Sequence, residues 1–157
     1  MHERTAVDSF PLTAREAELA IATNLPPIDH HGEIVEHVGP DCIRIRLPFK
    51  SEYVGSEPWQ DGSGRVFSGP MMMGFADTAM YCCVMAAMGR GVIPAMANLN
   101  ITFLRPARAA DLIAEARIVR RGARLHYLEC WLRSEAASEA CAHVTSTYRV
   151  ARRADRS

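Results

Sequence analysis

The stretch from Gly69 to Met88 is almost entirely apolar or small, and Asp77 is its single charged residue. A membrane-spanning helix needs ~20 such residues, so the length alone fits a span. Against a span, a carboxylate near the middle of lipid is costly, and two glycines and a proline fall in the first six positions. Because strand-like segments fill the rest of the chain, we expect a buried core helix and no membrane partner.

Segments on both sides of this helix alternate apolar and polar residues, as strands do. Residues 33–38 and 42–47 are joined by a Gly-Pro-Asp turn and predict a hairpin. Four more strands are predicted after the helix, at 97–104, 111–120, 124–133 and 140–150. Alternation indicates a sheet with one covered face, and a helix apolar all round must be buried on most sides. We therefore predict an α+β fold with a curved, mostly antiparallel sheet wrapped around the long central helix.

The length of 157 residues, with 48% hydrophobic residues, suits one domain with a real core. Thr13 and Glu16 have capping-box spacing, which predicts a short helix from about 14 to 23. We expect residues 1–31 to form an N-terminal tail and this short helix. Residues 32–150 form the main domain, and residues 151–157 form a C-terminal tail.

Charge and cysteine content exclude several classes of protein. Lys and Arg together number 18 and balance 18 Asp and Glu, which disfavours a nucleic-acid partner. The five cysteines are odd in number and show no Cys/His ligand spacing, so we expect no structural metal and a reducing compartment. The first residues lack the apolar run of a signal peptide. These features favour a cytoplasmic location.

Asp77 is the most informative residue for function. A carboxylate inside a buried helix costs several kcal/mol unless it is paired, or it takes up a proton. It is therefore either a functional group with a shifted pKa or a polar tether between the helix and a neighbouring element. Upstream, Ser68-Gly69-Pro70 suits a helix N-terminus, where free N–H groups can hold an oxyanion. The alternative role of Ser68 is that of a helix cap only.

Gly69 and Asp77 are eight residues apart, which is about 12 Å along a helix. An oxyanion donor and a catalytic carboxylate must each lie within about 3 Å of adjacent reacting atoms. One helix cannot easily meet both conditions, whereas two antiparallel copies in a symmetric dimer can. A catalytic site here therefore predicts a homodimer or a homotetramer.

The segments "SGPMMMGFADTAM" and "ANLNITFLRPA" resemble the hotdog-fold acyl-CoA thioesterases of the phenylacetate-pathway (PaaI-like) group, within the 4-hydroxybenzoyl-CoA thioesterase superfamily. The resemblance extends to about Val150 and is weak before Gly32. It implies a hotdog fold with sites at subunit interfaces. Asp77 matches the family's catalytic carboxylate, and Gly69 matches the glycine whose N–H polarises the thioester carbonyl.

The resemblance also implies residues that bind the substrate. Asn100 and Arg105 belong to the matching strand and turn after the helix, and Arg121-Gly122 forms a later turn. In relatives these turns lie near the pantetheine and phosphates of CoA. The arginines of this region either form a solvated surface or bind phosphate; they are Arg108, Arg120, Arg121 and Arg124.

The chain departs from the family at three polar positions. Ser68 stands where the family has His, Gly62 where it has Asn, and Met96 where it often has Ser or Thr. Asn98 could supply a substitute donor, because the strand alternation puts it opposite the apolar face of Leu99. Ser68 is expected to bond to the oxyanion or the attacking water, and not to be the nucleophile, since no His or Lys base stands in register with it.

The predicted function is hydrolysis of an acyl-CoA thioester to a free acid and CoA. CoA is then part of the substrate, and no separate cofactor is expected. A hotdog dehydratase is disfavoured because such enzymes pair a carboxylate with a His that this helix lacks. The alternative of another class is a non-catalytic domain that binds or senses acyl-CoA.

Overall fold

The computed structural model describes residues 12–153. The helices are α1 (Ala14–Asn24) and α2 (Gly69–Met88), with short 3₁₀ turns η2 (Pro27–Asp29) and η3 (Ser51–Tyr53). The strands are β1 (Ile34–Gly39), β2 (Cys42–Leu47), β3 (Val92–Phe103), β4 (Leu112–Arg121), β5 (Leu125–Ser134) and β6 (Ala142–Arg152). The predicted short helix is confirmed at its start and ends one residue later than expected, at Asn24.

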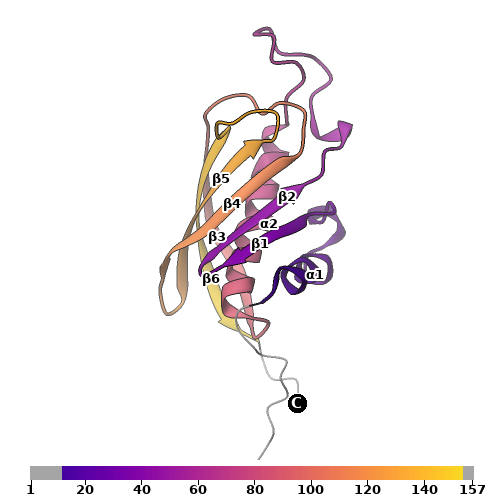
Figure 1. Ribbon diagram of the computed structural model, residues 1–157. Helices are drawn as coiled ribbons and strands as arrows, with labels where there is room; N and C mark the ends of the chain where they lie inside the picture. The colour runs from indigo at the N-terminus through magenta and orange to yellow at the C-terminus, as the bar shows by residue number, and fades with distance from the viewer. Residues whose placement is uncertain (1–11, 154–157) are drawn as a thin grey trace, which may run out of the picture.

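The six strands form one sheet in the order β1-β2-β4-β5-β6-β3, and every pairing is antiparallel. Figure 1 shows this sheet curving around α2, with α1 beside β1. The predicted α+β hotdog architecture is therefore confirmed. The predicted tail at residues 1–11 lies outside the described part of the chain, and β6 continues to Arg152.

β3 begins earlier than the alternation predicted, at Val92 instead of residue 97. Pro94 lies inside the added segment, where it pairs with Val150 of β6. A proline is tolerated there because β3 is the last strand of the sheet, and edge strands can lack one N–H. A bulge between Met96 and Asn98 also shifts the register, which hides the strand from a search for strict alternation.

Both ends of α2 have local causes. Ser68 is the N-cap, and its hydroxyl oxygen accepts a hydrogen bond of 3.4 Å from the Met71 N–H. Pro70 lies in the first turn, where its missing N–H has no cost. Gly89 ends the helix with φ +80°, a left-handed conformation that glycine adopts without strain. The cap interpretation of Ser68 is thus confirmed.

α2 is long and apolar enough to cross a membrane by composition, yet more than half of it is buried within this domain. The sheet and α1 cover most of its surface, as expected for a core helix. Its uncovered stripe follows helical spacing through Pro70, Met73 and Gly74, which are exposed, to Asp77, which is half-buried. One side of the central helix therefore faces solvent in the single chain.

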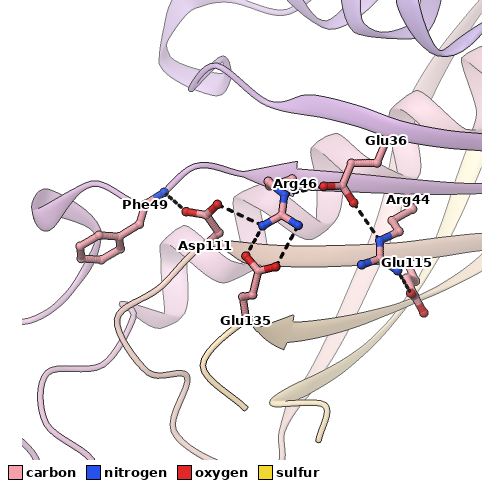
Figure 2. Close-up of polar contacts among 7 residues, drawn as sticks. All are labelled: Glu36, Arg44, Arg46, Phe49, Asp111, Glu115 and Glu135. Carbon is pink, nitrogen blue, oxygen red and sulfur yellow. Dashed lines mark hydrogen bonds and ion pairs between the residues drawn. The ribbon is translucent and has the colours of Figure 1, made fainter. Parts of the chain in front are cut away.

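Away from this stripe, around strands β1, β2 and β4, the sheet carries a network of ion pairs on its outer surface (Figure 2). Arg46 on β2 bonds to Glu36 and Glu135, and reaches Asp111 at 3.1 Å. Arg44 bonds to Glu36 at 2.9 Å and to Glu115 at 3.3 Å. These contacts join β1, β2 and β4 and the segment that follows β5.

Candidate active site

Asp77 is positioned by α2 and held by the last strand of the chain. The Tyr148 hydroxyl on β6 donates to the Oδ1 atom of Asp77 and lies 2.9 Å from its main-chain carbonyl oxygen. The interpretation of Asp77 as a tether between the helix and a neighbour is therefore confirmed. The side chain stays half-buried, so the tether does not close it off from solvent.

Burial raises the pKa of the Asp77 carboxyl above its ordinary value, because a charge is poorly solvated there. The hydrogen bond from Tyr148 lowers this pKa, and the nearby negative charge of Asp29 raises it. No cationic side chain pairs with Asp77 among residues 12–153. The carboxylate thus stands in an environment suited to accepting a proton.

The N-terminus of α2 presents a free donor. Among the described residues, no hydrogen bond engages the Gly69 N–H. A Cβ added to Gly69 would lie 3.3 Å from Cζ of Phe103, which is tighter than normal packing. Glycine at this position therefore lets the aromatic ring approach the helix end closely, and its N–H can bind an oxyanion.

A pocket of about 380 Å³ opens beside Gly69. Its walls come from the loop before α2, the first turn of α2 and the segment after β3. The lining residues are Trp59, Val66, Phe67, Gly69, Met72, Phe103, Leu104, Arg105, Pro106 and Ala107. Such an apolar, partly aromatic lining suits an organic group more than a bare ion.

The structure places Arg105 at this pocket and orients it toward the loop before β6. Its guanidinium donates to the carbonyl oxygen of Ala140, and its Nε lies 3.5 Å from Glu139. Gly69, Ser68 and Arg105 therefore lie at one end of α2. Asp77 lies two turns further along the helix, so one chain alone does not bring the acid to the N–H donor.

Asn98 and Asn100 lie on the edge strand β3, and both are exposed. The Asn98 side-chain oxygen accepts from the Thr147 N–H at 3.1 Å, next to the bulge. The amide oxygen is thus used to bridge the irregular register, which leaves the NH₂ group as the donor available to a ligand. Asn100 pairs with Thr145 in regular register.

Arg121 and Gly122 lie at the other end of α2. The Arg121 guanidinium is paired with Asp41 and contacts Sδ of Met88, the last helix residue. A Cβ on Gly122 would meet the Leu125 carbonyl oxygen at 2.6 Å, so this glycine is required by the tight turn. Within one chain the structure does not bring this turn together with Gly69 and Arg105.

Sequence reasoning missed Tyr148 and Phe103 as parts of the site. Tyr148 occupies an inward position of the β6 alternation, so the signal was a phenol on a face otherwise suited to apolar residues. Phe103 lies on the alternating apolar positions of the predicted strand, and the structure leaves it half exposed with its ring close to Gly69. Within residues 12–153, no three His, Cys, Asp or Glu side chains gather as a metal site.

The central part of the chain resembles a known protein family. The family model described as the thioesterase superfamily matches residues 64–141, a range that contains α2, Gly69 and Asp77. The matched range is 78 of the 157 residues, so the chain resembles the thioesterase superfamily over its central part. No curated protein sequence matches the chain.

Solved structures share the fold of this chain at low sequence identity. A thioesterase from Haemophilus influenzae is 17% identical with a TM-score of 0.76, covering 93% of this chain and 95% of that one. A candidate thioesterase from Silicibacter sp. TM1040 is 22% identical with a TM-score of 0.77, covering 93% and 96%. A candidate thioesterase described as phenylacetic acid degradation-related, from Ralstonia eutropha JMP134, is 21% identical with a TM-score of 0.69, covering 85% and 98%. The match to this family model supports hydrolysis of a small-molecule thioester as the class of reaction.

Proposed function

We propose that this protein hydrolyses an acyl-CoA thioester at a site shared between two antiparallel chains. The observation that carries the proposal is the uncovered stripe of α2. A free N–H donor stands at one end of it and a half-buried carboxylate stands two turns away. Both groups belong to an otherwise apolar surface, which a second copy of the same surface would cover.

Antiparallel pairing solves the problem of the distance. If two copies of α2 lie side by side in opposite directions, the Asp77 of each chain faces the Gly69 of the other. The edge strand β3 runs beside α2 and has one side without a strand partner among the described residues. Pairing of two such edges would extend the sheet and bring the two helices together.

In this arrangement the Gly69 N–H binds the carbonyl oxygen of the thioester. Negative charge grows on that oxygen as the carbonyl carbon becomes tetrahedral, and the helix N-terminus stabilises it. Losing one oxyanion donor in other enzymes costs about 3–4 kcal/mol of transition-state stabilisation. The Ser68 oxygen already accepts the cap bond from the Met71 N–H. Its hydroxyl proton is therefore the group that donates to the oxyanion or to the attacking water.

Asp77 supplies the second half of the chemistry, by one of two routes. As a general base it takes a proton from water, the resulting hydroxide adds to the carbonyl carbon, and the C–S bond breaks to release CoA. As a nucleophile it adds to the same carbon and displaces CoA, and water then cleaves the anhydride. Both routes need the ionised carboxylate.

The apolar pocket beside Gly69 suits the acyl group, because that group adjoins the carbonyl that the N–H binds. Arg105 at its rim is a candidate for the phosphates of CoA, while Arg121 is already paired with Asp41. The reaction as proposed needs only water besides the thioester, and a cytoplasmic location would provide acyl-CoA.

The direct test is release of free thiol from a panel of acyl-CoA esters by the wild type and by Asp77→Asn. We expect the substitution to lower kcat at least about a hundredfold, since a general base or nucleophile is lost. Asn removes a carboxylate whose pKa burial raises, so the variant should melt no lower than the wild type at pH 7.

Glu115→Gln, on the outer face of the sheet, is the matched control and should leave kcat unchanged. Wild-type protein that binds acyl-CoA tightly and releases no thiol would overturn hydrolysis and favour the sensing domain. An Asp77→Asn variant with full activity would remove Asp77 from the mechanism.

A further inference from the structure

Tyr148 places a phenol in the core at a position where Phe would fill the same volume. Its side chain is only 1% exposed, and it follows Ala142, Val144 and Ser146 along the inward face of β6. Burying a hydroxyl costs free energy unless it is hydrogen-bonded. The Tyr148 hydroxyl has its partner in Asp77, so the polar group is present for that carboxylate.

The surroundings of Tyr148 fix the direction of this bond. Tyr148 pairs with His126 of β5 on one side and with Met96 of β3 on the other. The bulge of β3 lies between Met96 and Asn98. The Ser146 hydroxyl stabilises it by donating a hydrogen bond to the Asn98 carbonyl oxygen. Tyr148 is thus flanked on both sides by paired strands, and its hydroxyl reaches α2 at Asp77.

We propose that Tyr148 is the positioning residue of the catalytic carboxylate. Its O–H occupies Oδ1 of Asp77, which leaves Oδ2 as the oxygen that meets water or the thioester carbonyl. This inference rests on the proposed hydrolysis for its catalytic consequence, while the bond itself does not.

The charge environment gives the bond a second effect. Within the described residues, the titratable side chains that shift the pKa of Asp77 are Tyr148 from β6 and Asp29 from η2. Burial and the Asp29 charge raise the pKa of Asp77, and Tyr148 opposes them by donating to the anion. Burial and the adjacent carboxylate also raise the pKa of Tyr148, so the phenol stays protonated and acts only as a donor.

The test that needs no activity is a ¹³C NMR titration of the Asp77 carboxyl carbon, assigned by its loss in Asp77→Asn. In Tyr148→Phe we expect the pKa of Asp77 to rise, because the donor to its anion is gone. In the control Asp29→Asn the pKa should fall, because a like charge is gone. Asp29 is exposed, so both variants probe one carboxylate from two sides.

The second readout is the pH dependence of kcat/KM for the same proteins. Hydrolysis requires ionised Asp77, so its acidic limb should move to higher pH in Tyr148→Phe and to lower pH in Asp29→Asn. At neutral pH, kcat of Tyr148→Phe should fall roughly tenfold and KM should stay within about threefold, since no substrate contact is removed. If Tyr148→Phe misfolds, 3-fluorotyrosine at position 148 keeps the shape. Its more acidic phenol should move the limb to lower pH.

An unchanged Asp77 pKa in Tyr148→Phe would overturn the proposal outright. A shifted pKa with an unmoved acidic limb would show that Tyr148 bonds to a carboxylate that does not limit catalysis, which also overturns it. If the wild type hydrolyses no thioester, the proposed function fails, and the titration still decides whether Tyr148 controls Asp77.

Discussion

The two edges of the sheet differ in what they offer to another molecule. At the β1 edge, α1 lies alongside, and the neighbouring outer surface carries the ion-pair network around Arg44 and Arg46 (Figures 1 and 2). At the β3 edge, large apolar side chains are exposed on the strand itself. These are Ile93, Met96 and Phe103.

This difference separates two ways of treating an edge. Charges and a covering helix discourage strand-to-strand association, as natural sheets commonly do. A bare apolar edge beside an uncovered helix stripe has the opposite character and is typical of a surface that is buried in an oligomer. The two candidate catalytic groups, the Asp77 carboxylate and the Gly69 N–H, lie on the β3 side only. The proposed hydrolysis would therefore depend on association of two chains at this surface.

The largest effect is expected from a charge placed on the uncovered stripe. Met73 is 39% exposed in the single chain, so Met73→Lys should leave the monomer folded while blocking helix-to-helix contact. We expect a monomer by light scattering and a loss of hydrolysis of at least about a thousandfold, because each site loses its acid or its donor.

The matched control uses the other edge. Ile34 on β1 is 43% exposed, and Ile34→Lys should change neither mass nor activity. A fully active Met73→Lys monomer would contradict the shared site. Equal disruption by both substitutions would erase the contrast between the edges.

A smaller effect, confined to one atom, is expected at Gly69. Gly69→Ala keeps the N–H and adds a Cβ against Phe103, whereas Gly69→Pro also removes the N–H at a position where helices accept proline. Relative to Gly69→Ala, Gly69→Pro should lose roughly 10²- to 10³-fold in kcat.

Steady-state kinetics of the two variants at equal, verified dimer content isolates the contribution of the N–H. Equal kcat in the two proteins would assign oxyanion binding to another group. In both, the mass and the melting temperature should stay close to those of the wild type.

The smallest effect is expected within the charged network. Arg46→Met should lower the free energy of unfolding by about 1 kcal/mol in urea, with no change in kcat, because partly exposed ion pairs are screened by solvent. The hydrogen bond from Arg46 lowers the pKa of Glu135, so this stabilisation is present above the unfolded pKa of about 4.3. The difference between the two proteins should shrink as the pH falls through the folded pKa of Glu135. A large loss of activity in Arg46→Met would break the separation between the two sides.

Much of the fold follows from local pattern. The long apolar run around Asp77 could only be a core helix once strands surrounded it, and the alternation at residues 42–47 and 124–133 located two strands closely. The start of β3 escaped prediction because a proline and a bulge interrupt the pattern there. Those irregularities are compatible with a strand only at an edge, and which strand lies at an edge is decided by tertiary pairing.

The candidate site could be proposed from the sequence where chemistry and helix position coincide, as at Asp77 and Gly69. Tyr148 could not be, because its partner lies 71 residues away in the chain and only the packing of β6 against α2 brings them together. Conversely, Arg121 looked available as a free cation, and the structure pairs it with Asp41, a contact across 80 residues. Long-range pairing of this kind leaves no periodic trace.

The two-turn offset between the acid and the N–H has a genetic consequence if chains pair as proposed. Every catalytic centre would then be a composite, taking its carboxylate from one copy and its backbone donor from the other. A chain damaged only at residue 77 and a chain damaged only at residue 69 would each be inactive with their own kind. A mixed pair would hold one fully intact centre and one doubly defective centre, so two non-functional alleles could complement each other.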